Sequence, residues 1–374
     1  MKGSFYTNEY PNLFEKAGYK KEEIDEKLQN IFDEMFFNRH RFYFDSGEDM
    51  GYVVDTGNLD ARSEGMSYAM MATLQMDRKD LFDRLWKWSF TYMLNRDGIN
   101  KNFFAWSLGL DGKKNFTGAA PDGEEFFAMA LIFASKKWGD GEAPFDYMTQ
   151  ARAILHACLH QEEEVPGGRG MWDLDNALIR FVTNVDFSDA SYHLPHFYEL
   201  FALHANEKDR PFWKRAAEES RKYIVRSCHP VTGFSPEYGN YDGSPYPGVH
   251  EDFYSDAYRV AGNIGLDAAW FGMRPEYTEI ANKIQQFFKK EGMSLENLKK
   301  YRIDGTSTGD PALHPYGLMA TNAQASLATD TSLSKEFVDF LWEMPVRKGE
   351  RRYYDNFLHF FSFLAVSGRY KIWN

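Results

Sequence analysis

Residues 55–71 read Asp-Thr-Gly-Asn-Leu-Asp-Ala-Arg-Ser-Glu-Gly-Met-Ser-Tyr-Ala-Met-Met, a polar loop that runs into an apolar stretch. The apolar stretch, which continues to Met76, predicts a helix, and Ser63 stands where an N-cap residue is expected. Glu64 then lies in the first helical turn, where the helix dipole stabilises a carboxylate and lowers its pKa. Taken alone, Glu64 can be an acid that only stabilises the helix start. Whether it has a catalytic role depends on the rest of the chain.

An apolar helix followed by an amphipathic helix recurs along the chain. The helix predicted at 63–76 is apolar, and the next one, at 80–94, is charged on one face. The amphipathic helix at 21–37 pairs with the last helix, which makes six hairpins. Six hairpins that close on themselves predict an all-α fold, an (α/α)6 barrel, in one catalytic domain over 1–374. The other helices are predicted at 122–137, 145–160, 190–205, 209–227, 252–269, 275–290, 316–328, 334–343 and 351–366.

Composition narrows the possible ligands. Aromatic residues make up 17% of the chain, which predicts rings that line a binding surface, and the net charge of -12 argues against nucleic acid and anionic membranes. Cys158 and Cys228 both fall in helix-like stretches, so no disulfide framework or cysteine zinc site is expected. The first residues have no apolar core of a signal peptide and no stretch is long enough to span a bilayer, so we expect a cytoplasmic protein.

The loops that lead into the apolar helices carry the residues suited to chemistry. In a closed helical barrel these loops gather at one mouth. Carboxylates among aromatic rings, without a lysine cluster, are suited to splitting a glycosidic bond, because that reaction needs a protonated acid and an ionised base. Crowding and burial raise carboxyl pKa values, which opposes the helix dipole at Glu64. The residues expected at the mouth are Glu64, Asp122, Asp189, Tyr192, Asp252 and Asp256.

An ordered set of segments resembles glycoside hydrolase family 8, over nearly the whole chain. These segments are NLDARSEGMSYAMM (58–71), FAWS (104–107), APDGEEFF (120–127), SDASYHLPHF (188–197) and YSDAYR (254–259). Within that family the chain is most similar to the reducing-end xylose-releasing exo-oligoxylanases. The segments that carry this closer resemblance are LHPYGLMATN (313–322), RRYYDN (351–356) and YKIW (370–373).

The resemblance implies an inverting hydrolase on an (α/α)6 barrel, with no cofactor. Glu64 matches the general acid, Asp256 the general base, and Asp122 the third acid, which binds the sugar at the cleavage subsite. Tyr192 matches the tyrosine that helps Asp256 hold the attacking water. An inverting pair stands roughly 6.5–9.5 Å apart to leave room for that water.

Each of these residues also has a plainer structural reading. Asp256 can form an ion pair with Arg259 three residues later. Asp122, which follows Pro121, can simply form the turn or N-cap at a helix start, and Tyr192 can be an ordinary core residue. Among residues expected to contact sugar, Trp106 offers a flat ring face and His314 is implied to read the free reducing end. The loop 313–315 is implied to close the cleft beyond one leaving-side sugar, although it can also be a helix-entry turn. The predicted substrate contacts are Trp106, Arg259, His314, Tyr354 and Trp172.

We therefore predict an enzyme that releases xylose from the reducing end of β-1,4-xylooligosaccharides. An endo-acting family 8 xylanase or glucanase would cut polymers instead. A sugar epimerase on the same barrel would use His193 and His196 as proton shuttles, and a carbohydrate-binding relative would have lost the catalytic residues, which are all present here. No further ligand follows His193 and His196, so no metal site is predicted. The sequence leaves the oligomeric state open.

Overall fold

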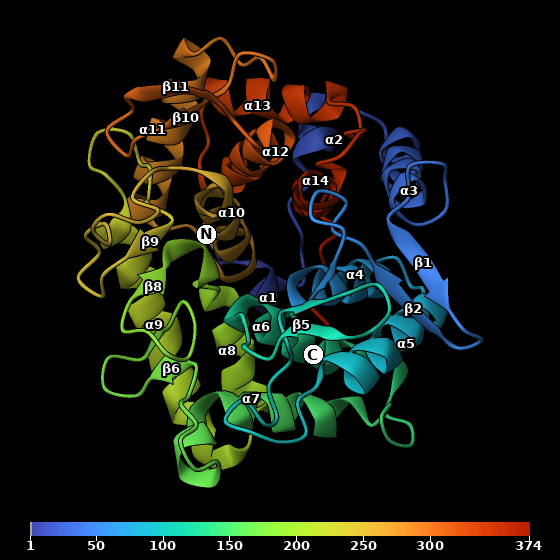
Figure 1. The fold of residues 1–374 in the computed structure, drawn as a ribbon. Coiled ribbons are helices and arrows are strands. Elements are labelled where there is room, and N and C mark those ends of the chain that lie inside the picture. The colour runs from blue at the N-terminus through green and yellow to red at the C-terminus, as the bar shows by residue number, and fades with distance from the viewer. Residues whose placement is uncertain (1) are drawn as a thin grey trace. The chain divides into compact units, whose positions relative to one another are not determined.

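The computed structural model describes residues 2–374, and helices dominate it (Figure 1). The predicted alternation of apolar and amphipathic helices is confirmed. Helix α4 (Ser63–Gln75) is buried along nearly its whole length, whereas α5 (Lys79–Trp88) buries only one face. The other helices are α1 (Ser4–Thr7), α2 (Leu13–Ala17), α3 (Lys21–Phe36), α6 (Pro121–Trp138), α7 (Tyr147–Glu164), α8 (Pro195–His204), α9 (Arg210–Ser227), α10 (Arg259–Phe271), α11 (Pro275–Lys290), α12 (Pro315–Gln324), α13 (Ser332–Glu343) and α14 (Arg352–Val366).

Two of the predicted helices are shorter than expected because each is preceded by a separate 3-10 turn. The turn η2 (Ala190–Tyr192) ends before α8, and η4 (Ser255–Tyr258) leads into α10. Proline has no N–H and a fixed φ, so it favours the first position of a helix, and α8 begins at Pro195. The predicted ranges 190–205 and 252–269 are therefore each one 3-10 turn plus one helix. The other 3-10 turns are η3 (Glu207–Asp209) and η5 (Ala325–Ala328), and a π-helix, η1 (Ser89–Met93), follows α5.

Short antiparallel strands connect the helices. The strand β3 (Ala61–Arg62) pairs with β4 (Ser107–Leu108), which also pairs with β5 (Lys114–Phe116). This small sheet stands at the entrance to α4. The other pairs are β1 (Tyr43–Ser46) with β2 (Met50–Val53), β6 (Trp172–Asp173) with β7 (Leu178–Ile179), β8 (Ser188–Asp189) with β9 (Tyr238–Gly239), and β10 (Lys299–Tyr301) with β11 (Ser307–Pro311).

The chain forms two compact units, each built from several segments. In the first unit α12 packs against both α10 and α14, the orange and red helices of Figure 1. In the second unit α6 packs against α4 and α7. One catalytic domain over the whole chain stays a prediction. The first unit comprises Met1–Glu34, Phe187–His196 and Ser220–Lys371, and the second comprises Met35–Asp186, Phe197–Glu219 and Ile372–Asn374.

The length and hydropathy of the helices decide whether any of them can span a bilayer. Within residues 2–374 no helix is both long enough and apolar enough to cross a membrane.

Candidate active site

Glu64 lies in the first turn of α4, as predicted, but Ser63 is not the N-cap. Arg62 precedes the helix in an extended conformation and makes no side-chain cap. The Ser63 N–H donates instead to the Trp106 carbonyl over 3.1 Å, next to the β3–β4 pairing. The first N–H of the helix is therefore satisfied by the backbone directly before β4, and no side-chain cap is present.

An ionic cluster fixes the loop that leads to Glu64. The Arg62 Nε lies 3.0 Å from Asp60 Oδ1 and 3.1 Å from Asp55 Oδ2. The other oxygen of Asp60 accepts from Ser107 Oγ over 2.6 Å. These buried contacts join the loop to β4, so Asp55 and Asp60 act as supports of the helix start.

Asp122 lies in the first turn of α6 and is 4% exposed. The next residue is Gly123, where an added Cβ would stand 2.7 Å from the Cβ of Ser63. Real Cβ atoms do not approach so closely, so glycine is what lets the first turns of α4 and α6 touch. Glu64 and Asp122 are therefore carried on helix ends in direct contact.

A neighbouring carboxyl of α6 is fully buried. Glu124 Oε1 accepts from the Phe104 N–H over 2.8 Å. Burial raises the pKa of Glu124 well above its usual range, and this hydrogen bond opposes the shift only in part. The side chain therefore ties the segment before Trp106 to the start of α6.

Trp106, the predicted stacking residue, is half-buried and belongs to an aromatic pair. Its ring stacks on Phe116 with centroids 5.2 Å apart, and the Arg62 guanidinium lies 5.3 Å from its ring centre. Phe116 is 57% exposed, and the sequence prediction missed it because a single Phe in the polar segment 113–117 has no pattern around it. The pair presents apolar surface beside the entrance to α4.

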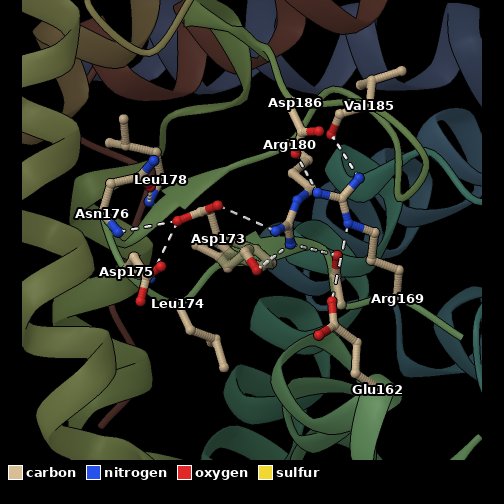
Figure 2. A network of polar contacts seen from close by, with 12 residues as sticks. Glu162, Arg169, Asp173, Leu174, Asp175, Asn176, Leu178, Arg180, Val185 and Asp186 are labelled. Carbon is tan, nitrogen blue, oxygen red and sulfur yellow. Dashed lines mark hydrogen bonds and ion pairs between the residues drawn. The ribbon is translucent and has the colours of Figure 1, made fainter.

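Trp172 lies in the core of the second unit, which removes it from the expected sugar contacts. It is 1% exposed and packs edge-to-face on Trp213 with centroids 4.9 Å apart. Arg180 donates to the Gly170 carbonyl over 3.0 Å and to Asp173 over 3.2 Å, and Figure 2 shows this network. The guanidinium thus fixes the short β6–β7 hairpin that holds the indole inward.

Asp256 lies in the first unit, in the turn η4, with its side chain 32% exposed. Ser255, directly before it, has a φ of 37°, which a residue with a Cβ rarely adopts. Such a conformation persists only where the surroundings hold it, and it is typical of functional sites. The Arg259 Nη2 lies 3.5 Å from Asp256 Oδ1, so the simple ion pair considered above is present.

Arg259 also brings together the two predicted tyrosines. It is 5% exposed, and its guanidinium lies 5.4 Å from the ring centre of Tyr192 and 5.9 Å from that of Tyr354. The Tyr354 hydroxyl is 3.5 Å from the Ser255 carbonyl. Four predicted site residues, namely Asp256, Arg259, Tyr192 and Tyr354, therefore form one cluster within the first unit.

Two buried carboxyl groups flank Asp256. Burial, followed by the charge of Asp256, raises the pKa of Asp189, and the same two causes raise the pKa of Glu237 to about 9. Both causes favour the protonated form of each group. Glu237 was not predicted, because it comes from a loop with no helical pattern. Asp252, which was predicted, forms an ion pair with Lys300 over 2.8 Å.

His193 and His196 are core residues. The His193 ring lies between Ser188 Oγ and Ser220 Oγ, at 2.9 and 2.8 Å. Burial lowers the pKa of His193 well below its usual range and that of His196 to about 3, so both rings are neutral. Both are fully buried, which leaves the epimerase hypothesis without its proton shuttles.

The loop 313–315 is held by a buried carboxylate that the sequence prediction missed. Asp355 is fully buried and accepts from the Gly317 N–H over 2.5 Å, at the first turn of α12. Its other oxygen lies 3.3 Å from His314 Nδ1 and also pairs with Arg347. Arg347 in turn donates to the Leu313 carbonyl over 2.9 Å.

The same brace fixes the direction of the His314 ring, which meets Tyr354 edge-on with centroids 4.7 Å apart. The loop is therefore more than a helix-entry turn, because three separate groups hold it. Asp355 stands next to Tyr354 in the segment already singled out, but its partners are up to 41 residues away, so no local pattern predicts them.

Comparison with known proteins places this geometry in a family. The model of "Glycosyl hydrolases family 8" matches residues 41–368. The reducing-end xylose-releasing exo-oligoxylanase Rex8A of Paenibacillus barcinonensis is 53% identical, over 100% of this chain and 99% of its own. The corresponding protein of Halalkalibacterium halodurans is 53% identical, over 99% of this chain and 96% of its own.

A solved structure agrees with the sequence comparisons. The structure of Rex8A from Paenibacillus barcinonensis complexed with xylose has a TM-score of 0.97, with 53% identity, and covers 100% of both chains. The predicted fold class, an all-α (α/α)6 barrel, is thereby confirmed. The chain belongs to glycoside hydrolase family 8.

Proposed function

We propose that this protein is an inverting glycoside hydrolase that releases xylose from the reducing end of β-1,4-xylooligosaccharides. The observation that carries the proposal is the full-length similarity, at 53% identity, to relatives that bear the name of that activity. A cytoplasmic location, where the enzyme would act on oligosaccharides taken up by the cell, stays a prediction.

In the proposed mechanism Glu64 protonates the leaving oxygen and Asp256 takes a proton from the attacking water. Asp122 binds the sugar at the point of cleavage. Tyr192 helps to hold the water, which is supported by the position of Arg259 beside both Tyr192 and Asp256. Burial and the charge of Asp256 raise the pKa of both Asp189 and Glu237, which disfavours either of them as the ionised base.

The exo specificity is assigned to the loop 313–315. If this loop closes the cleft after one leaving-side sugar, His314 is placed to bind the free reducing end. Asp355 and Arg347 support the assignment, since a loop that limits substrate length has to resist displacement by longer chains. Trp106 and Tyr354 complete the proposed sugar contacts.

The reaction is tested with xylotriose and xylotetraose, with the anomers of the products followed by proton NMR. We expect xylose plus a shortened oligomer whose new reducing end is first α, and we expect no cleavage when the reducing end of the substrate has been reduced. A new end that is first β would exclude inversion. Internal cleavage would replace the exo assignment with the endo-acting alternative.

The division of roles is tested with Glu64→Gln and Asp256→Asn. Each should lower kcat on xylotriose by about 10²–10⁴-fold, the usual contribution of a general acid or base. On β-xylobiosyl fluoride, whose leaving group needs little protonation, Glu64→Gln should regain activity and Asp256→Asn should not. The matched control is Glu48→Gln, an exposed glutamate, which should leave both rates unchanged. Equal recovery by both variants would overturn the assignment.

A further inference from the structure

A cluster of metal-ligand side chains lies in the second unit, on α7 and just before α9. His156 and His160 are one helical turn apart on α7, and their rings stack with centroids 4.5 Å apart. Asp209, at the end of η3, is 4% exposed and faces both histidines. None of the three has a role in the proposed hydrolysis.

The atoms that face one another are suited to a shared cation. His160 Nε2 lies 2.8 Å from Asp209 Oδ1, and His156 Nδ1 lies 3.7 Å from Asp209 Oδ2. One ligand atom from each residue lies within 4.8 Å of the others. In residues 2–374, His156 Nδ1 and Asp209 Oδ2 are both buried without a hydrogen-bond partner, which is costly for polar atoms. A cation between them would satisfy both.

In each ring the nitrogen that faces away from Asp209, called here the outer nitrogen, also supports a metal site. His156 Nε2 lies 2.6 Å from Glu164 Oε1, and His160 Nδ1 lies 3.0 Å from Glu163 Oε1. An ionised carboxylate only accepts, so each outer nitrogen carries a proton. The inner nitrogen of His156, which has no hydrogen-bond partner, can then serve as a ligand, and the inner nitrogen of His160 can do so when a metal ion replaces the proton that it donates to Asp209. Histidines that bind metals are usually oriented in this way by a carboxylate on the other ring nitrogen.

We propose that His156, His160 and Asp209 bind a divalent transition-metal ion, Zn²⁺ being the ion that their chemistry fits best. Two imidazole nitrogens and one carboxylate oxygen are ligands typical of zinc, whereas Mg²⁺ and Ca²⁺ prefer oxygen alone. In tetrahedral zinc sites neighbouring ligand atoms stand about 3.3 Å apart, as follows from zinc–ligand bonds of about 2.0–2.1 Å. The observed separations are 2.8 Å to Asp209 Oδ1 and 3.7 Å to Asp209 Oδ2, and one ligand atom from each residue lies within 4.8 Å of the others, so binding through one shared oxygen requires a small movement of these side chains.

The ion would join the C-terminal half of α7 to the start of α9, with water completing its coordination. Such a site would stabilise the second unit and needs no part in catalysis. The sequence prediction of no metal site considered the two cysteines and the pair His193 and His196, but not His156 and His160. The pair at 156 and 160 has the spacing of two ligands on one helix face, but Asp209 is 49 residues further along the chain.

The test is a titration of the full-length, tag-free protein, freed of metals by a chelator, with ZnCl₂ by isothermal titration calorimetry. We expect one equivalent to bind and the midpoint of thermal unfolding to rise with ZnCl₂. Asp209→Asn and His160→Gln should abolish both effects. Glu164→Gln should weaken binding by about 10–100-fold, as loss of an outer carboxylate does.

His40→Gln is the matched control, since it removes another partly exposed histidine from the same unit. It should bind Zn²⁺ as the wild type does. A crystal soaked in ZnCl₂ should show an anomalous peak among the three ligand atoms, which does not depend on any variant folding. Absence of that peak, or equal affinity in wild type and Asp209→Asn, would overturn the proposal and leave a network of hydrogen bonds and ion pairs.

Discussion

Asp355 is the residue through which the position of the loop 313–315 can be changed without touching the catalytic acid or base. Asp355→Asn keeps the shape of the side chain but removes the charge that pairs with Arg347 and faces His314. Breaking such a buried pair should destabilise the fold by roughly 3 kcal/mol. Because the loop is released, the preference for xylotriose over xylotriitol, its reduced form, should fall by about tenfold or more in kcat/KM.

Measuring both stability and substrate preference separates an effect on the loop 313–315 from general destabilisation of the fold. Asp330→Asn, an exposed aspartate of the same unit, is the control and should change neither stability nor preference. If Asp355→Asn lowered stability but left the ratio of the two kcat/KM values unchanged, the brace would be structural only.

Glu237 should make stability depend on pH. Its pKa in the fold, about 9, lies above its usual value of 4.5, so the fold favours the protonated form. The stabilising contribution is fully present below about pH 4.5 and is lost as the pH rises towards about 9. Urea unfolding of Glu237→Gln at several pH values should show a flatter decline than wild type. The difference for one proton is at most about 1.4 kcal/mol per pH unit. If the free energies of unfolding of wild type and Glu237→Gln fell in parallel with pH, the predicted role of Glu237 would be wrong.

At the scale of elements, the contact between α4 and α6 depends on a single glycine. In Gly123→Ala the new methyl group would stand 2.6 Å from Ser63 Oγ, so the two helix starts must move apart. Overpacking of this kind costs about 1–3 kcal/mol, and displacement of Glu64 and Asp122 should lower kcat as well. Adding Ser63→Gly should restore both. Gly118→Ala, where nothing lies within 4 Å, should be neutral in urea unfolding and in kcat.

The helices could be predicted because each is either apolar throughout or apolar along one periodic face, and both patterns are local properties of the sequence. The N-cap of α4 was predicted wrongly, since the Ser63 N–H donates to the distant Trp106 carbonyl and no local pattern in the sequence predicts that hydrogen bond. The carboxylates and Tyr192 were selected by their place before the apolar helices, and the resemblance supplied their catalytic roles. Four predicted site residues, two catalytic and two substrate-binding, cluster in the first unit. Glu237 and Asp355 were missed because they act through partners from other segments of the chain. Trp172 was wrongly predicted to contact sugar, because its packing on Trp213 is a tertiary contact that the sequence does not reveal.

At the scale of the whole molecule, the net charge of -12 should affect charged and neutral substrates differently. Xylotriose is neutral, so its kcat/KM should be nearly the same in about 0.01 M and about 1 M NaCl, although the Debye length falls from about 30 Å to about 3 Å. A xylooligosaccharide that carries glucuronic acid is repelled by the protein, and its kcat/KM should rise with salt. If salt does not raise kcat/KM for this charged oligosaccharide, its glucuronic acid group is excluded by size and not by charge. If salt slows xylotriose, the active site depends on ion pairs that salt screens.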